Sequence, residues 1–478
     1  MSRVTGAGSL ARVKLVAGVD CSTQNTKVVV CDVETGEVVR EGRAPHPDLT
    51  EVDATVWWQA WEQASAGILD GVEAVSVGGQ QHGMVLVDEA GTPVRDALLW
   101  NDNRSAPQAA TLIEELGGPQ AWADSTGVVP VASFTVTKLR WVAEHEPDVA
   151  ARAQGVLLPH DWITHQLRGG AGEPTTDRGD ASGTGYWSAA AGAYRTDLLR
   201  TAFGRELAVP RVARPSEAVG ETPTGIVLAP GTGDNMGAAL GLDLEPGDVV
   251  VSLGTSGTVF AVSERPTSDP SGIVAGFADA TGRFLPLVCT LNAARVVGAA
   301  LTMAGAELSD LDRLALSVDD TAGLVLLPFL DGERTPALPD ATGLLHGLTR
   351  SNATPAHLVR AAVEGMLCGL ADAVAPLEAS GVTPRRIVLI GGAARSAAVQ
   401  RIAAGLFALP VAVPAPAEYV ALGAARQAAW TLSQAESAPR WTRGSTTVRP
   451  EDGSADYYRR VRAAYSSVLE GAQPLLRG

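Results

Sequence analysis

The sequence contains few cysteines and no long apolar run. Four cysteines occur among the 478 residues, and no two of them form a CxxC pair. Because a disulfide scaffold or a zinc ribbon needs a denser and more regular pattern, we expect reduced, mostly buried thiols in a cytoplasmic protein. No uninterrupted apolar run reaches the roughly 18 residues that a membrane-spanning helix needs. A membrane is therefore not an expected partner.

Positive charge is also scarce. The chain has 37 Lys and Arg residues against 53 Asp and Glu residues, a net charge of −16, and its lysines are Lys14, Lys27 and Lys138. Without a concentrated basic face, the chain is not expected to bind nucleic acid. No lysine follows a glycine, which excludes the Walker A phosphate loop. The GxGxxG dinucleotide motif and the HRD motif of protein kinases are absent too, so a bound nucleotide needs another device.

Two matching hairpins supply such a device. The segments "VAGVDCSTQNTKVVV" (Val16–Val30) and "VVVSLGTSGTVFA" (Val249–Ala261) both predict a strand, a small polar turn and a second strand, with Thr23 aligned on Thr255. A turn of Gly, Ser and Thr presents backbone N–H groups and hydroxyls without bulk, which suits an oligophosphate. A single copy is equally well explained as a favourable turn, but the matched second copy favours phosphate binding from two sides.

The repeated hairpin indicates an internal duplication, and the length of the chain also favours two domains. The segment "GLDLEPGD" (Gly241–Asp248), rich in Gly, Pro and acidic residues, is the best candidate for a hinge between them. We expect a disordered leader over residues 1–12, an N-terminal domain over 13–242 and a C-terminal domain over 243–478. The second domain is expected to contain a strand over 386–394 and a closing helix over about 457–470.

Two carboxylates stand where phosphoryl transfer to an alcohol needs them, since that chemistry requires a metal ligand, a base and a closed cleft. Asp20 ends the first strand and faces the turn, where Mg²⁺ on the phosphates would lie; its alternative role is a cap of the turn. Asp234 lies in "PGTGDNMGAALG" just before the hinge, where a carboxylate can accept the proton of a substrate hydroxyl. Its alternative role is the N-cap of a helix that starts at Asn235.

Taken together, the motifs resemble those of the FGGY carbohydrate kinases, over roughly residues 16–475. The resemblance rests on segments that occur in the same order as in that family: Asp20–Lys27, "GGQQHG" (Gly78–Gly83), "LWNDNR" (Leu99–Arg104), "FTVTKLRW" (Phe134–Trp141), "LLPHDW" (Leu157–Trp162), "GTGDNMGAALG" (Gly231–Gly241), "SLGTSG" (Ser252–Gly257), "LDGERTP" (Leu330–Pro336) and "IGGAARS" (Ile390–Ser396). Each segment is weak by itself, and their shared order makes the resemblance strong.

The resemblance implies an α/β, two-lobed actin-like ATPase fold with duplicated ribonuclease-H-like domains and an interdomain cleft that holds ATP and Mg²⁺. It implies that Asp234 is the catalytic base and that Asp20 is the catalytic acidic residue and the metal ligand. Gln81, His82 and Asn235 match sugar-contacting positions, and we add Asp102 and Arg104 as candidates near the cleft. The nucleotide side is expected to use Ser22, Thr23, Lys27, Gly254, Thr255, Ser256, Gly391, Gly392, Ala393 and Arg395.

Two of these positions depart from the family pattern. Ser22 stands where the first hairpin usually has glycine, which adds a hydroxyl and removes some backbone freedom. Ala393 stands where many members have a third glycine, so a methyl group is expected to trim the nucleotide pocket slightly.

The "QQHG" segment is similar to that of the xylulose-phosphorylating members, which implies that the sugar is D-xylulose and the product D-xylulose 5-phosphate. The alternative within the family is another ketopentose, a polyol or a sugar acid. An alternative of a different class is a nucleotide-driven binding protein or a sugar-sensing regulator that transfers no phosphate. The expected partners are a small sugar and ATP, with a homodimer as the candidate assembly.

Overall fold

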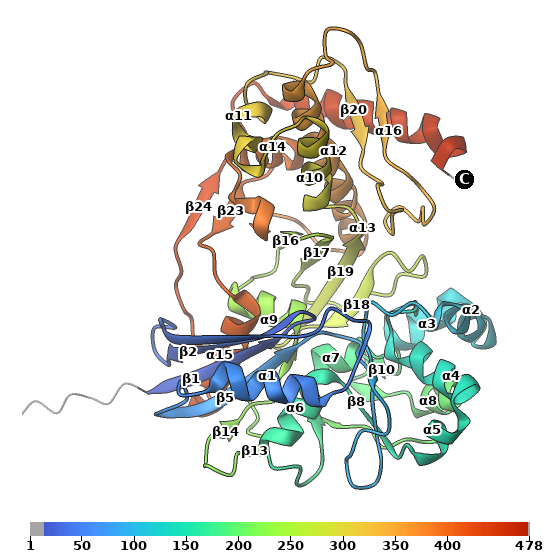
Figure 1. Cartoon of the computed structure of the whole chain (residues 1–478), viewed down its shortest axis with the longest axis vertical. Coiled ribbons are helices and arrows are strands. Elements are labelled where there is room, and N and C mark those ends of the chain that lie inside the picture. Colours follow the sequence, from blue (N-terminus) through green and yellow to red (C-terminus); the bar gives the residue numbers. More distant parts are fainter. Residues whose placement is uncertain (1–13, 477–478) are drawn as a thin grey trace, which may run out of the picture.

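Two seven-stranded mixed sheets form the framework of the chain, one in each of two lobes (Figure 1). The structure is a computed structural model that describes residues 14–476, so the leader expected over 1–12 lies outside the described residues. Each sheet contains the same unit: an antiparallel hairpin whose first strand also pairs in parallel with a later strand. This repetition confirms the duplicated, two-lobed α/β fold expected from the sequence.

The first sheet has the order β13-β14-β5-β1-β2-β3, with β15 paired to β5. Its strands are β1 (Leu15–Cys21), β2 (Asn25–Asp32), β3 (Val38–Pro45), β5 (Val72–Gly79), β13 (Gly220–Glu221), β14 (Val227–Leu228) and β15 (Thr232–Gly233). The central strand β1 is buried on both faces because α1 (Thr55–Ser65) packs against β2 and β3 while α15 (Tyr419–Ser433) packs against β1 and β5. Continuous Val-rich runs are typical of strands covered on both sides.

The second sheet has the order β18-β19-β17-β16-β22-β23-β24. Its strands are β16 (Asp248–Leu253), β17 (Gly257–Ala261), β18 (Ala275–Ala278), β19 (Phe284–Thr290), β22 (Arg386–Ile390), β23 (Val411–Pro414) and β24 (Ser445–Val448). The helices of this lobe are α10 (Ala294–Met303), α11 (Leu311–Ala315), α12 (Pro355–Asp372), α13 (Val374–Ala379), α14 (Ala397–Phe407) and α16 (Ala455–Leu476). The closing helix expected at 457–470 is α16, which is longer at both ends.

Short elements between the sheets build the outer part of the first lobe and the loops of the second. The helices are α2 (Ala106–Glu115), α3 (Pro119–Thr126), α4 (Thr135–His145), α5 (Pro147–Arg152), α6 (Pro159–Leu167), α7 (Arg178–Ser182), α8 (Thr196–Phe203) and the 3₁₀ turns η1 (Leu308–Asp310) and η2 (Gly392–Arg395). The strands are β4 (Glu51–Val52), β6 (Val85–Val87), β7 (Ala97–Leu98), β8 (Gly155–Leu157), β9 (Thr175–Thr176), β10 (Trp187–Ser188), β11 (Ala193–Tyr194), β12 (Arg211–Val212), β20 (Val325–Leu327) and β21 (Leu344–His346).

The strand expected over 386–394 is wrong in its second half. Strand β22 ends at Ile390, and Gly391 has φ of 95°, a left-handed conformation that turns the chain into η2. A Cβ at this position would lie 2.5 Å from the Leu253 carbonyl oxygen, so glycine also permits the close approach of this turn to β16.

The lobes are joined through α9 (Asp234–Gly241) and residues 242–247, the segment expected to be the hinge. Helix α9 crosses α15 so closely that a Cβ on Gly423 would overlap the carbonyl oxygen of Gly237. Helix α15 thereby places a late part of the chain against the first sheet, beside β1 and β5 (Figure 1). The domain boundary at 242/243 stays a prediction, since α15 comes late in the sequence but packs on the first sheet.

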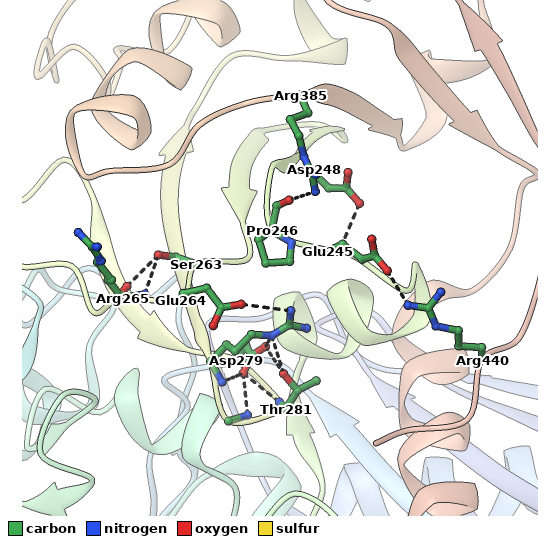
Figure 2. A network of polar contacts seen from close by, with 12 residues as sticks. Glu245, Pro246, Asp248, Ser263, Glu264, Arg265, Asp279, Thr281, Arg385 and Arg440 are labelled. Atoms are coloured by element: carbon green, nitrogen blue, oxygen red, sulfur yellow. Dashed lines mark hydrogen bonds and ion pairs between the residues drawn. The ribbon is translucent and has the colours of Figure 1, made fainter. Parts of the chain in front are cut away.

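Polar contacts anchor the connector to the second lobe and to the loop after α15, as Figure 2 shows. Glu245 forms a 2.6 Å ion pair with Arg440, and its backbone N–H donates to the Asp248 carboxylate at 3.1 Å. The Arg385 guanidinium donates to the carbonyl oxygen of Pro246.

Within the described residues, no helix combines the length and the apolar character needed to cross a membrane.

Candidate active site

A cavity of about 1270 Å³ lies between the two lobes and collects many of the predicted residues. From the first lobe and α9 it is lined by Asp20, Lys27, Asp234 and Asn235, and from the second lobe by Ser252, Gly391, Gly392 and Arg395, among others. The end of β1, the end of β16 and the start of α9 all reach this cavity. The chain thus brings both predicted carboxylates to one cleft.

Asp20 is suited to hold a cation. Its side chain lies at the end of β1 and is only 4% exposed, and burial raises the pKa of the carboxyl although Lys27 opposes the effect. Its Oδ1 atom is buried without a hydrogen-bond partner. An orphaned carboxylate oxygen in a cavity matches the preference of Mg²⁺ for oxygen ligands. Among the described residues no group of three or more His, Cys, Asp and Glu side chains forms a metal site, so phosphate oxygens and water would complete the coordination.

Lys27 bridges two carboxylates in the cleft. Its Nζ atom lies 2.6 Å from Glu418 Oε2 and 3.4 Å from Asp20 Oδ2. Lys27 faces Asp20 directly across the β1–β2 pairing, whereas Glu418 immediately precedes α15. The sequence analysis missed Glu418, because nothing in a segment 391 residues away indicates the contact.

The first hairpin turn is held by its own polar groups. The N–H and the hydroxyl of Ser22 both donate to the carbonyl oxygen of Asn25, at 3.0 and 3.2 Å. The Thr23 hydroxyl accepts a 2.8 Å hydrogen bond from the Trp100 indole. These hydroxyls shape the turn, and phosphate contacts through them stay a prediction.

The second hairpin turn, Gly254–Ser256, joins β16 to β17 and lies beyond the residues that line the cavity. Its carbonyl groups accept hydrogen bonds from the start of α10: Ala294 donates to Gly254 at 2.9 Å and Arg295 to Thr255 at 3.2 Å. Beside the turn, Gly391 and Gly392 line the cavity, and a Cβ on Gly392 would meet open space. Ala393 follows within η2 and is not among the lining residues, whereas Arg395 is.

Asp234 has the environment of a general base. It is the first residue of α9, and Gly233 occupies the N-cap position for which Asp234 was the alternative. The Oδ1 atom accepts two hydrogen bonds from Asn235, from its N–H at 2.7 Å and from its side-chain amide at 2.8 Å. Burial, together with the negative charge of Asp20, raises the pKa of Asp234 to about 7. A carboxylate with such a pKa can exchange a proton near neutral pH.

Gln81 and His82 lie on the first-lobe side of Asp234, directly after β5. Asn235 donates from its amide to Gln81 Oε1 at 3.2 Å, which links this segment to α9. The His82 Nδ1 atom lies 2.6 Å from the Gly183 carbonyl oxygen, so Nδ1 carries the hydrogen and Nε2 is left as an acceptor. Burial, with a smaller contribution from Lys138, lowers the pKa of His82 to about 3, so the ring is neutral.

Two aromatic rings enclose the His82 imidazole. Phe134 lies 4.7 Å away between centroids and Phe277 lies 5.8 Å away. Phe277 comes from β18 of the second sheet, whose hairpin with β19 reaches toward the first lobe (Figure 1). Phe134 lies in a segment that matches the family, but its contact with His82 was not predicted, and the pattern of β18 gives no sign of the contact that Phe277 makes.

Asp102 and Arg104 form an ion pair at 2.9 Å, and Arg104 also binds Glu51 at 2.6 Å. Burial alone would raise the pKa of Asp102, but its hydrogen bonds with Arg104 outweigh that effect and lower it. The Arg104 guanidinium lies 5.0 Å from the centre of the Trp141 ring. Both side chains are therefore engaged with the protein itself, and a contact of either with a sugar stays a prediction.

A buried acidic cluster surrounds His160 behind β5. Its Nε2 atom lies between 3.2 and 3.4 Å from carboxylate oxygens of Asp161, Asp177 and Asp180. Burial alone would lower the pKa of His160, but the three carboxylates outweigh it and raise the pKa to about 9. These acids lie at the starts of α6 and α7, where Asp177 caps α7 by accepting from the N–H groups of Gly179 and Asp180.

Comparison with known proteins places this geometry in a family context. A family model for the N-terminal domain of the FGGY family of carbohydrate kinases matches residues 15–241, and the corresponding C-terminal model matches residues 249–432. A xylulose kinase of Streptomyces coelicolor is 47% identical over 98% of this chain and 98% of its own length. The crystal structure of xylulose kinase from Bifidobacterium adolescentis covers 96% of this chain and 99% of its own, with a TM-score of 0.87 and 42% identity. That from Rhodospirillum rubrum covers 97% of this chain and all of its own, with a TM-score of 0.89 and 26% identity.

Proposed function

We propose that this chain, which belongs to the FGGY family of carbohydrate kinases, transfers the γ-phosphoryl group of ATP to D-xylulose and forms D-xylulose 5-phosphate. The observation that carries the proposal is the meeting of Asp20 and Asp234 in the interlobe cavity, with a neutral His82 on its sugar side. The substrate is supported by relatives named xylulose kinase that match nearly the whole chain.

Asp234 acts as the general base in this proposal. The sugar hydroxyl attacks the γ-phosphorus, a new O–P bond forms, and the bond between that phosphorus and the bridging oxygen of ADP breaks. The hydroxyl proton passes to Asp234, whose Oδ1 is held by Asn235 while Oδ2 faces the reaction. The pKa of about 7 lets the carboxylate take this proton and release it to solvent afterwards.

The negative charge of the phosphates is offset by Lys27 and by the cation that Asp20 would hold. Asp20 would hold Mg²⁺ through the unpartnered Oδ1 atom, and Mg²⁺ neutralises charge on the phosphate oxygens when it is bound. Lys27 then donates to a phosphate oxygen in exchange for its contact with Glu418. The remaining nucleotide contacts are assigned to Ser22, Thr23, Gly254, Thr255, Ser256, Gly391, Gly392, Ala393 and Arg395.

His82, Gln81 and Asn235 orient the sugar. The free Nε2 atom of His82 accepts a hydrogen bond from a sugar hydroxyl, because Nδ1 already donates to Gly183. The amides of Gln81 and Asn235 are joined to each other and can donate to and accept from further hydroxyls. Asp102 and Arg104 complete this side from the loop after β7.

The test is ADP release across a panel of D-xylulose, other ketopentoses, polyols and sugar acids, with the phosphorylated product identified by mass spectrometry. We expect D-xylulose to have the highest kcat/KM. If glycerol or ribulose exceeds it by about tenfold, which is about 1.4 kcal/mol of transition-state binding, the substrate is wrong and the kinase activity stands. ADP release without any phosphorylated sugar would instead favour a nucleotide-driven binding or sugar-sensing protein.

The expected assembly and location, a homodimer in the cytoplasm, are part of the same proposal. Light scattering coupled to size-exclusion chromatography tests the first, since a mass near 49.3 kDa would exclude the dimer.

A further inference from the structure

Lys138 is a buried lysine without a carboxylate partner. It lies on α4, its relative exposure is 0%, and it is one of only three lysines in the chain. Within residues 14–476, no carboxylate lies at ion-pair distance from its Nζ atom, and Asp102 acts on it only through the longer-range field. Burial lowers the pKa of Lys138 to about 7. Because a buried amine needs hydrogen-bond partners, its two acceptors are informative.

Both acceptors are backbone carbonyl oxygens beside the predicted sugar site. Nζ donates to the carbonyl of Ser133 in the turn before α4, and to the carbonyl of His82 at 3.4 Å. The Thr135 hydroxyl donates to that same His82 oxygen at 3.1 Å. Two side chains of one helix therefore converge on a single carbonyl group.

That carbonyl belongs to a residue with an unusual backbone. His82 has φ of 67°, a left-handed conformation that a residue with a Cβ rarely adopts unless its surroundings hold it there. Its ring is fixed separately by the 2.6 Å contact of Nδ1 with Gly183, where an added Cβ would lie 2.9 Å from the imidazole. The direction of the Nε2 lone pair therefore depends on two restraints, the Gly183 contact on the ring and the backbone conformation that Lys138 and Thr135 help to hold.

We propose that Lys138 is a positioning residue for sugar recognition: with Thr135, it holds the carbonyl of His82 and thereby aims the His82 imidazole at the sugar. The inference rests on the proposed function, because it takes His82 to face the sugar. In this proposal Lys138 does not contact the sugar itself, since it is fully buried, and it acts through the His82 backbone.

The first experiment compares Lys138→Met with the matched control Thr137→Val. Thr137 lies on the same helix and is equally buried, but its hydroxyl contacts Phe134 at 2.9 Å and Ser105 at 2.9 Å instead of His82. We expect Lys138→Met to raise the KM for the sugar by about tenfold, the effect of a misplaced hydrogen bond, with kcat and the KM for ATP changed less than about threefold. Thr135→Val should shift the sugar KM in the same direction, and Thr137→Val should leave it unchanged. Equal losses in all three variants would show a merely structural role and overturn the inference.

The second experiment repeats Lys138→Met in a His82→Ala background. If Lys138 acts through His82, its replacement should then change the sugar KM by less than about twofold, because the ring that it aims is gone. A tenfold effect that persists without the imidazole would mean that Lys138 acts on the sugar by another route, and the inference would be wrong.

A spectroscopic readout keeps the inference testable if the proposed function fails. The two kinetic experiments use the sugar of the panel that is phosphorylated with the highest kcat/KM. They therefore remain valid if that sugar is not D-xylulose. If no sugar is phosphorylated, the imidazole ¹H–¹⁵N signals of His82, assigned by their loss in His82→Ala, report on the ring in the free protein. Lys138→Met should shift or broaden these signals while Thr137→Val should not. Unchanged His82 signals in Lys138→Met would overturn the inference.

Discussion

At the scale of single residues, the two cleft carboxylates are made different by what surrounds them. Asp20 keeps one oxygen without a protein partner, whereas one oxygen of Asp234 is fully used by Asn235. Burial raises the pKa of Asp234, the hydrogen bonds from Asn235 oppose this effect, and the negative charge of Asp20 adds to it. These differences support our proposal that Asp20 holds a cation and Asp234 accepts a proton.

Replacing Asp234 by Asn tests the role of the proton acceptor. The amide keeps the size and can still accept from the Asn235 N–H, but it cannot take a proton. We expect kcat to fall by roughly 10²–10⁴-fold, the usual range for a general base, while sugar affinity measured by calorimetry changes much less. An Asn variant that keeps more than about a tenth of the wild-type kcat would remove Asp234 from this role.

The pH dependence of the reaction follows from the raised pKa of Asp234. The base works only when it is deprotonated, so kcat/KM for the sugar should be constant at high pH and fall as the pH drops through about 7. With an unperturbed carboxyl the fall would occur near pH 4 instead, about three pH units lower. Steady-state rates between pH 5 and 9 check the expectation, and a flat profile down to about pH 5 would contradict it.

The site could be predicted from the sequence where a motif carries its own chemistry. Asp20 and Asp234 follow from a strand end and a glycine-rich helix start, and the structure brings both into one cavity. Glu418 and Phe277 were not predictable, because each reaches the site from a segment whose local pattern is ordinary. Lys138 was visible as a rare lysine within a family motif, but its contact with a backbone carbonyl depends on tertiary packing.

At the scale of elements, the crossing of α9 and α15 explains how a late helix supports the helix that carries Asp234. The helices approach through Gly241 and Gly423, where an added Cβ would overlap backbone atoms of the facing helix, and through Gly237, where it would lie 3.3 Å from the Val420 carbonyl oxygen. Small residues at such a crossing let the two backbones pack directly. The start of α9, and with it Asp234, is thereby fixed against a segment that belongs to the other half of the sequence.

Substituting Gly423 by Ala should destabilise this crossing. The new methyl group would meet the Gly237 carbonyl, so we expect a loss of about 1–3 kcal/mol in the free energy of unfolding, the usual effect of overpacking. Gly298→Ala is the matched control, because this helical glycine of α10 has nothing within 4 Å of an added Cβ. Urea denaturation should show the control unchanged or slightly more stable by up to about 1 kcal/mol, as alanine favours helices. Equal stability of the two variants would contradict the importance of the crossing.

Elements were predicted well wherever a long periodic or apolar run defined them. The strands of both hairpins follow from such runs, and their ends fall within a few residues of expectation. The end of β22 was misplaced, since the apolar run continues into Gly391 and Gly392 while the backbone already turns. The positive φ of Gly391 accompanies its close approach to Leu253, which the sequence does not show.

At the scale of the whole molecule, the duplicated sheets place the cleft between two similar halves. The second half of the sequence also reaches the first lobe, because α15 packs on the first sheet and the β18–β19 hairpin brings Phe277 to His82. A change in the angle between the lobes would therefore alter the sugar side and the nucleotide side together. Such closure is the usual way for a kinase to exclude water from a reacting phosphoryl group.

Closure predicts a smaller radius of gyration when both substrates are bound. D-Xylulose contacts only the first-lobe side in our proposal, and the nucleotide contacts both lobes, so neither ligand alone should give the full effect. Small-angle scattering with sugar plus a non-hydrolysable ATP analogue should show a measurable decrease, with the sugar alone and the analogue alone as controls. The connector contacts Arg440 and Arg385 in this structure, and we expect the hinge movement around Gly241–Asp248. An unchanged radius with both ligands present would exclude hinge closure, and the 1270 Å³ cavity would then have to act as a preformed site.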